Sequence, residues 1–596
     1  MSDYYTPAIV SNWSLSSAGD IIQAHIQNSS PRLTVVQARL ESLQALDPIY
    51  AIPVDILAYI FHIGTHSDED DGIQFPILVS HVCRSWRCLA LNSSTLWTNI
   101  SISSGSIGQW DSFPTGPVLP KASSFAFRSQ GCPLSIKIDL LKPHLPTLRE
   151  EVVPLVMRLL STATIEFIAS VHDRVRALDI STDMNDTVFM ATYRLFPLGL
   201  PMLESLHIYF GEPKDSFERQ TWDVPNQDFA EFDASGLRGG WLGTQDTGLP
   251  VDALLPHLKE LQLYGVRATW NQWSIGNLTS LSLNYMAFAD RPSGNQLREV
   301  LVKNAGSLVN LELCAMLPPN WASDQTPPIV LPRLRKLRVG YGEQIEAISF
   351  LLALEVPSLK SLALCDVPRS FHHSHRRVLT HSHFAEDIPI DLTIPSFSLE
   401  QDFDSTLLLC SLSRRCRALL SQIETLELIH VLLIPRPALW VDNFFAGQVT
   451  AQFLCPIEFI AAMPSLRTLI LNGPDPAMLQ SLNQHLTLPA QPTDGVSPIK
   501  PCVTYAGAQI STLQIIHSDY DDLVDFLYNR TEIARDPDHS RLLPVFDTLE
   551  LCLEPDDVEL LRDECKSGQV QADLLARDAR CVATARPHLD DDEPLL

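Results

Sequence analysis

The sequence predicts an α/β chain in which an N-terminal helical module precedes a solenoid built from short parallel strands. Two observations predict this fold class. A split pattern of aliphatic residues and tryptophan lies between residues 52 and 100, and the string L-x-x-L-x-L recurs in one register from residue 175 to residue 551. Candidate helices with aliphatic residues three and four positions apart, at 295–303 and 343–351, lie between copies of the string.

The N-terminal segment, residues 1–47, contains one amphipathic stretch. Its apolar residues follow the first and fourth positions of a heptad and predict a helix over residues 31–46: Leu33, Val36, Leu40 and Leu43. The stretch is shorter than the three or four heptads typical of a coiled coil. We therefore favour a helix that folds onto the following module over a dimerisation zipper.

The module at residues 48–101 combines two predicted amphipathic helices. Pro53 suits a first helical turn, where its missing N–H has no partner to lose. The spacing that follows predicts an apolar stripe along one face of the first helix, formed by Ile56, Leu57, Ile60 and Phe61. A second stripe is formed by Val79, Val82, Cys83, Trp86, Leu89 and Ala90. So small a core is expected to pack on something else.

The order of these residues resembles the F-box, the module that docks onto the Skp adaptor of cullin–RING ubiquitin ligases. The matching parts are Ile52-Pro53, Asp55, the pairs Ile56-Leu57 and Ile60-Phe61, the run Val82-Cys83-Arg84-Ser85-Trp86, and Leu96-Trp97. An acidic insert at 67–72 and Ile in place of the usual Leu before Pro53 depart from the family pattern. The resemblance implies an adaptor contact made by Pro53, Ile56, Leu57, Ile60, Phe61, Val82, Cys83 and Trp86. A helical hairpin of an unrelated domain is the alternative.

Residues 102–555 carry the repeats. Copies start at Val175, Leu203, Leu258, Leu278, Leu308, Leu334, Leu359, Ile423, Leu466 and Phe546. Intervals of 20 to 30 residues in the central copies are typical of leucine-rich repeats, in which each unit buries its apolar side against its neighbours. The alternating stretch 131–139 predicts a strand that starts the solenoid. An ordinary α/β domain with leucine-rich strands is the alternative.

The concave strand face of such a solenoid is the expected binding surface for a target. Residues between the inward leucines point outward there, and the candidate contacts are Gln262, Ser282, Glu312 and Arg338. They are mixed in charge and small, without an aromatic ladder or a basic stripe, so we expect a protein target rather than a nucleic acid. Recognition through the loop insertions expected at 213–250 and 366–405 is the alternative.

The C-terminal segment, residues 556–596, is predicted to contain a charged helix from Asp556 to Lys566 and a disordered acidic tail. The combination of an F-box, a strand with Pro-Leu-Ser-Ile and degenerate repeats resembles the large F-box families of mushroom-forming fungi.

Composition restricts the classes of partner. The chain has 596 residues, 43 Lys and Arg against 70 Asp and Glu, and a formal charge of −27, which disfavours a nucleic-acid partner. No run of apolar residues is long enough to span a bilayer, no signal peptide is recognised, and the twelve cysteines form no CxxC pair. We expect a cytoplasmic or nuclear protein with no membrane partner.

Residues suited to catalysis cluster at one place only, in five histidines between His372 and His383. Imidazole suits Zn, Cu or Ni, but the segment is flanked by loop residues, so a solvated polar insertion is favoured over a metal site. Phosphate loops, nucleophile elbows and His-Glu-x-x-His helices are not found. We expect no cofactor and no catalysis. The sequence therefore favours a substrate-recognition subunit that joins a Skp–cullin ligase core to an unknown protein target, over a repeat scaffold without a ligase role and over an enzyme assembled from distant residues.

Overall fold

The structure is a computed structural model of the 596-residue chain. It describes residues 52–65, 74–103, 119–140, 153–182, 198–210, 255–266, 275–286, 291–318, 327–367, 405–431, 451–488, 502–505, 507–536 and 545–583, with a few single residues between these ranges. The chain divides into two compact units, Met1–Asn99 with Arg128–Gln130, and Ile100–Phe127 with Gly131–Leu596.

The first unit is helical. It consists of α3 (Val54–Thr65), α4 (Phe75–Val82), α5 (Arg84–Asn92) and the 3-10 helix η3 (Ser94–Trp97). The ring of Phe61 lies at its centre, fully buried, with an edge contact to Trp86 at 5.0 Å between centroids. Trp97 is also fully buried, and its indole N–H donates to the carbonyl of Ala90 over 2.8 Å. Trp97 is therefore the buried tryptophan of this unit, and its polar atom has the partner that burial requires, whereas Trp86 of the predicted stripe is half-buried.

The second predicted helix is two helices. Cys83 lies between α4 and α5 in an extended conformation (φ −153°, ψ 172°), and its Sγ accepts a hydrogen bond from the N–H of Trp86 over 3.4 Å. Cys83 therefore caps the start of α5 rather than continuing the stripe of α4. The prediction of one helix across Val82 and Trp86 was wrong because apolar spacing alone does not reveal such a break.

The second unit contains a long parallel sheet. Among the described residues, fourteen strands form it in the order β1-β2-β3-β4-β5-β6-β7-β9-β11-β12-β13-β16-β17-β18. Their bounds are β1 (Asn99–Ser103), β2 (Leu134–Leu140), β3 (Val175–Thr182), β4 (Ser205–Phe210), β5 (Glu260–Tyr264), β6 (Ser280–Asn284), β7 (Asn310–Cys314), β9 (Lys336–Tyr341), β11 (Ser361–Asp366), β12 (Thr425–Ile429), β13 (Thr468–Asn472), β16 (Thr512–Ile516), β17 (Phe546–Leu553) and β18 (Ala576–Ala583). From β2 to β18 each strand pairs in parallel with the next.

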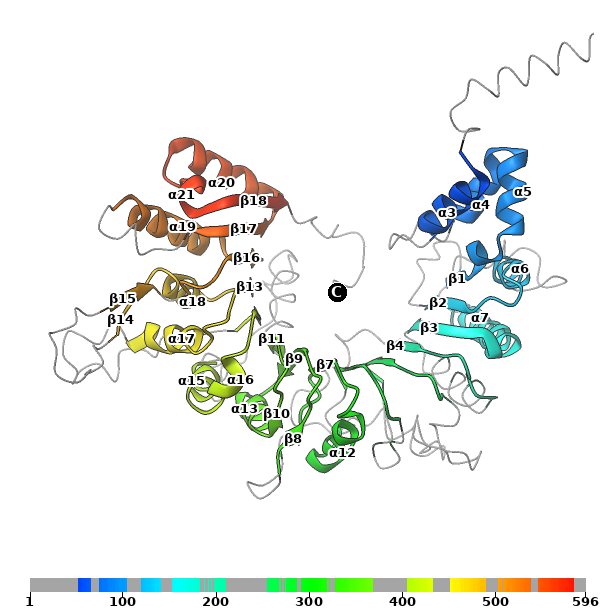
Figure 1. The fold of residues 1–596 in the computed structure, drawn as a ribbon, viewed down its shortest axis with the longest axis horizontal. Helices are drawn as coiled ribbons and strands as arrows, with labels where there is room; N and C mark the ends of the chain where they lie inside the picture. The colour runs from blue at the N-terminus through cyan, green and yellow to red at the C-terminus, as the bar shows by residue number, and fades with distance from the viewer. Residues whose placement is uncertain are drawn as a thin grey trace, which may run out of the picture. The chain divides into compact units, whose positions relative to one another are not determined.

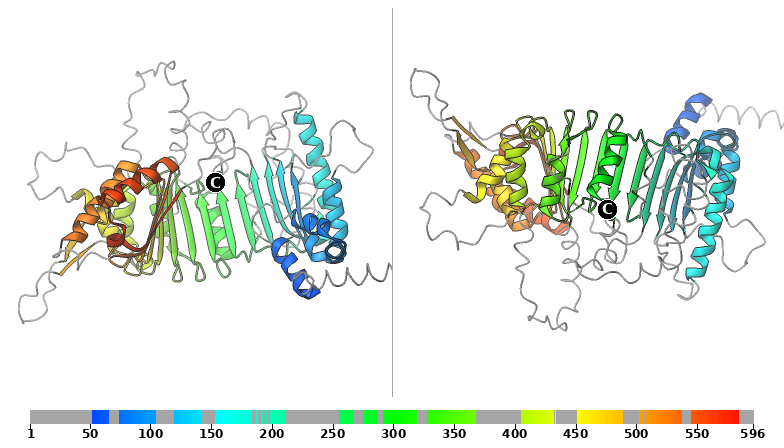
Figure 2. Two further views of the ribbon diagram at one scale, coloured as in Figure 1. Left: turned by 90° about the horizontal axis from the view of Figure 1, so that it is seen from above. Right: turned by 90° about the horizontal axis from the view of Figure 1, so that it is seen from below.

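Helices of this unit lie along one face of the sheet (Figures 1 and 2). They are α6 (Pro120–Arg128), α7 (Val153–Ser170), η5 (His172–Arg174), α12 (Gly294–Asn304), α13 (Gln344–Leu352), α15 (Thr406–Arg415), α16 (Arg417–Leu420), α17 (Ala451–Ala461), α18 (Pro476–Ser481), α19 (Tyr520–Arg535), α20 (Pro555–Ser567) and α21 (Ala572–Leu575). Two small separate sheets pair β8 (Ile329–Val330) with β10 (Leu354–Glu355), and β14 (His485–Leu488) with β15 (Cys502–Tyr505). The helices predicted at 295–303 and 343–351 are confirmed as α12 and α13.

The repeated leucines set the register of the sheet. The second leucine of each string pairs with its equivalent on the next strand, so that one layer contains Leu261, Leu281, Leu311, Leu337 and Leu362. Each of these five side chains has at most 2% of its surface exposed. The predicted parallel strands with their leucines in successive buried layers are therefore confirmed, and the α/β class with them.

A left-handed turn follows many of the strands. The seventh residue after the first leucine of a string has a positive φ in six copies, at Gly265, Tyr285, Ala315, His430, Gly473 and His517. The N–H of each turn residue donates to the strand-end carbonyl of the next repeat, for example from Tyr285 to Cys314 over 2.8 Å and from Gly473 to Ile516 over 2.8 Å. Each such turn thus adds one backbone hydrogen bond between neighbouring repeats at the ends of their strands.

The sheet includes strands that the repeat string did not reveal. β16 belongs to a copy of the string in which Ile510 replaces the first leucine and Ile515 replaces the last. Its Leu513 and Ile515 are fully buried. The array was expected to end at residue 555, whereas β18 pairs with β17 beyond the charged helix, which is α20. The helix predicted at 31–46, the insertion at 213–250, the interior of 366–405, the histidines of 372–383 and the acidic end of the chain lie outside the described residues.

Candidate functional site

The first helix of the first unit is apolar on two opposite faces. Leu57, Phe61 and Thr65 are buried, and they are spaced four residues apart along one side of α3. At about 100° per residue, four further apolar residues fall on the opposite side, within about 100° of one another. They are Ile56, Tyr59, Ile60 and Ile63, with exposed fractions of 48%, 63%, 44% and 53%. These four residues are called the apolar helix face below.

The neighbouring helix adds to the exposed apolar surface of this unit. Leu78 and Val82 lie one turn apart on α4 with exposed fractions of 58% and 60%, while Val79 between them is buried. Single exposed aliphatic residues are ordinary, but a helix that exposes a second apolar face in addition to its buried one is normally covered there. The grouping on α3 and α4 is therefore typical of a surface that packs against another molecule.

The predicted adaptor contacts separate into three groups by burial. Pro53, Ile56, Ile60 and Val82 are exposed, whereas Leu57 and Phe61 are buried within the unit and Cys83 and Trp86 are half-buried. The four residues of the predicted stripe, Ile56, Leu57, Ile60 and Phe61, differ in burial, because only Leu57 and Phe61 face the core of the unit. Leu57 and Phe61 pack in the core of the helical unit, whereas Ile56 and Ile60 remain accessible to a partner.

The predicted target-binding residues lie side by side in the second unit, on the face of the sheet formed by the residues between the inward leucines. Gln262, Ser282, Glu312 and Arg338 are in register on the consecutive strands β5, β6, β7 and β9. This row is called the open face below. Gln262 is exposed, Ser282 is buried, and the two charged side chains are half-buried.

The open face is a connected polar network. Ser282 donates to a carboxylate oxygen of Glu312 over 3.2 Å and accepts from the amide of Asn284 over 2.9 Å. The other oxygen of Glu312 lies 3.5 Å from Nη1 of Arg338. Nη2 of Arg338 donates to Glu427 over 3.0 Å. Glu312 and Arg338, the two charged residues predicted to contact a target, therefore also form an ion pair with each other.

Arg338 reaches past a neighbouring strand to make this contact. Glu427 lies on β12, and β11 separates it from β9 at the register position of Ala363. The methyl side chain of Ala363 leaves room for the guanidinium to cross. Burial opposes the charge of Arg338, but the carboxylates of Glu427 and Glu312 outweigh it and raise the pKa of Arg338 above its ordinary value.

An aromatic ladder borders the open face, which the sequence did not predict. The rings of Tyr209 and Tyr264 stack with centroids 4.4 Å apart, and Tyr285 lies 4.8 Å from Tyr264 in a tilted arrangement. Only 6% of the surface of Tyr264 is exposed, and its burial raises the pKa of its hydroxyl. The row predicted from the sequence, Gln262, Ser282, Glu312 and Arg338, contains no aromatic residue, and the three tyrosines lie beside it. Because the middle ring is buried, the ladder packs internally rather than offering successive free rings for stacking.

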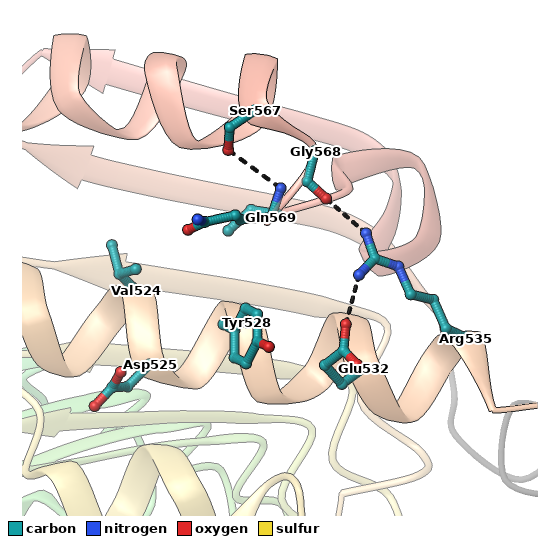
Figure 3. A pocket seen from close by; sticks show the side chains of 9 residues that line it. Val524, Asp525, Tyr528, Glu532, Arg535, Ser567, Gly568 and Gln569 are labelled. Carbon is teal, nitrogen blue, oxygen red and sulfur yellow. Dashed lines mark hydrogen bonds and ion pairs between the residues drawn. The ribbon is translucent and has the colours of Figure 1, made fainter.

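A pocket of about 500 Å³ lies between α19 and the turn that follows α20 (Figure 3). Its lining includes Asp525, Tyr528 and Glu532, and Arg535 donates to the carbonyl of Gly568 over 2.6 Å and pairs with Glu532. The N–H of Gln569 donates to the hydroxyl of Ser567, and the lining has carboxylates but no histidine. The combination of histidine and carboxylate that would favour an enzyme does not occur in this pocket.

Within the described ranges, no group of three or more His, Cys, Asp or Glu side chains is placed to hold a metal ion. No helix among the described residues combines the length and apolar character needed to cross a bilayer. A comparison with known protein families finds no matching family model, and no curated protein matches the sequence.

Proposed function

We propose that the chain is a substrate-recognition subunit of a Skp–cullin ubiquitin ligase. The helical unit docks on a Skp-type adaptor, and the sheet holds a protein target for ubiquitin transfer by the partner enzymes. The observation that carries the proposal is the apolar helix face of α3, which leaves Ile56, Tyr59, Ile60 and Ile63 exposed on the side opposite the buried core. The resemblance of the sequence between Ile52 and Trp97 to the F-box supports the identity of the partner.

The second part of the proposal assigns target recognition to the open face, with the parallel sheet as a leucine-rich-repeat solenoid. The in-register leucines, the left-handed turns and the helices along one face support that interpretation. Glu312, Arg338 and Glu427 offer two carboxylates and one guanidinium to a partner, at the half-buried depth where polar contacts fix orientation. A protein surface with both signs of charge is the partner class that this arrangement suits.

The alternative is a scaffold in which the helical unit recruits nothing. In that case its apolar residues would serve internal packing and would be covered. The exposure of Ile56 and Ile60 favours the adaptor proposal.

The test is co-purification of the full chain with a recombinant Skp-type adaptor. Replacing Ile60 and Val82 together by Asp should abolish the complex, because charges would enter a desolvated apolar contact. The matched control is Ile345→Asp, which alters an aliphatic residue on α13 with 51% of its surface exposed. The control should bind like the unaltered chain. If the adaptor binds none of the unaltered chain, the double variant and the control, the scaffold alternative is favoured. If the double variant binds as well as the unaltered chain, the proposed docking surface is rejected.

A further inference from the structure

Two cysteines from neighbouring helices meet side chain to side chain in the second unit. Cys410 lies on α15 and Cys455 on α17, and their sulfur atoms are 2.9 Å apart. A disulfide requires an S–S distance of about 2.05 Å, so the two sulfurs need to approach by less than ~1 Å.

The two thiols differ in access. Cys410 is half-buried, whereas Cys455 has 6% of its surface exposed and its Sγ also lies 3.4 Å from the carbonyl of Thr406. A small oxidant in solution therefore reaches Cys410 first. Cys455 is held behind it, in position to attack a modified Cys410.

We propose that Cys410 and Cys455 form a reversible disulfide site that reacts with a low-molecular-weight disulfide of the glutathione type. The thiolate of Cys410 attacks one sulfur of the small disulfide, which forms a mixed disulfide and releases one small thiol. The thiolate of Cys455 then attacks the Cys410 sulfur and releases the second small thiol. The two cysteine thiols are oxidised, the small disulfide is reduced to two thiols, and the two protons leave with those thiols.

The bond would join two successive helix layers. α15 and α16 precede β12 and α17 precedes β13, and these two strands are neighbours in the sheet. The closed loop contains β12, which carries Glu427 of the open face. Oxidation would therefore constrain a strand that contributes to the proposed target surface, and because a crosslink restricts the unfolded chain, it should raise the melting temperature.

The experiment treats the full chain under native conditions with glutathione disulfide, blocks remaining thiols with an alkylating reagent, and maps peptides by mass spectrometry. We expect a crosslinked peptide pair containing Cys410 and Cys455, which reduction with dithiothreitol removes. Cys416→Ser is the matched control, because Cys416 is a neighbouring buried thiol whose pKa burial raises to about 11, and the crosslink should persist in that variant. Exposed Cys88 provides an internal reference for simple glutathione addition.

Two further variants test the order of attack. Cys455→Ser should accumulate glutathione on Cys410, and Cys410→Ser should leave Cys455 unmodified. Unchanged circular dichroism and melting temperature of the reduced variants establish that they are folded. The proposal is overturned if Cys88 is modified while the unaltered chain forms no Cys410–Cys455 crosslink. The order of attack is overturned if Cys455 takes up glutathione when Cys410 is absent.

Discussion

The apolar helix face gives a quantitative expectation for the double substitution of Ile56 and Ile60 by Ala. The two side chains have exposed fractions of 48% and 44%, so about half of each remains to be buried on docking. Fully burying an isoleucine contributes ~1.5–3 kcal/mol, and the two exposed halves together therefore contribute ~1.5–3 kcal/mol. Because ~1.4 kcal/mol corresponds to a tenfold change in affinity, the double variant should bind a Skp-type adaptor about 10- to 150-fold more weakly.

Isothermal titration calorimetry of the full chain with the adaptor measures this change, and two single variants separate docking from folding. Ile345→Ala removes an equally exposed aliphatic side chain on α13 and should leave the affinity unchanged. Leu57→Ala removes a side chain with only 8% of its surface exposed, and it should lower the free energy of unfolding of the helical unit by ~2–5 kcal/mol. The reasoning fails if the double variant keeps the affinity of the unaltered chain, or if Ile345→Ala weakens binding to the same extent.

Three further predictions concern the sheet. Gly473→Ala should lower the free energy of unfolding in urea by ~2–5 kcal/mol, because the added Cβ would collide with Nδ1 of His430 and the residue has a φ of +57°. Gly568→Ala, which has open space around it, should cost only the ~1–2 kcal/mol of a left-handed alanine. The hydrogen bond from Arg176 lowers the pKa of Glu204, so this bond stabilises the fold above the ordinary pKa of 4.5 and the stabilisation is lost as the pH falls. Glu204→Gln should therefore flatten the acid side of a plot of melting temperature against pH. An unchanged slope would contradict this. Arg338→Ala should reduce capture of a protein target in pull-downs while changing the free energy of unfolding by about 1 kcal/mol or less. Arg176→Ala, which removes an ion pair outside the open face, should leave capture of the target unchanged.

The strands were the most predictable part of the fold. Each L-x-x-L-x-L string became a strand in the parallel sheet, because an alternating apolar pair and a preceding leucine specify which side chains enter the core. β16 was missed because isoleucine stands at Ile510 and Ile515, and an aliphatic rather than leucine-only pattern would have found it. β18 was missed because only Ala576 among its described side chains is buried, so the strand has no alternating apolar pattern.

The candidate site was less predictable, since it depends on which residues become neighbours. The sequence indicated that Glu312 and Arg338 face the same side, but not that Arg338 would also pair with Glu427 across the strand of Ala363. The tyrosine ladder could have been found in part by aligning the repeats, because Tyr209 and Tyr264 each stand six residues after the first leucine. Tyr285 stands seven residues after its own, and only the left-handed turn brings its ring to the others.

The left-handed turn at the end of many strands has a consequence for the tolerance of the sheet to added length. Each turn closes its own strand and bonds to the next one, so the alignment of strands depends on residues close to them in sequence. The chain between Phe210 and Glu260 is much longer than that between Tyr264 and Ser280, yet Leu206 still pairs with Leu261 and Leu261 with Leu281. Segments between successive strands can therefore be lengthened without changing the strand register, provided that buried helices such as α12 are retained. They are natural positions at which to graft a foreign peptide or an epitope tag without disturbing the strands on either side.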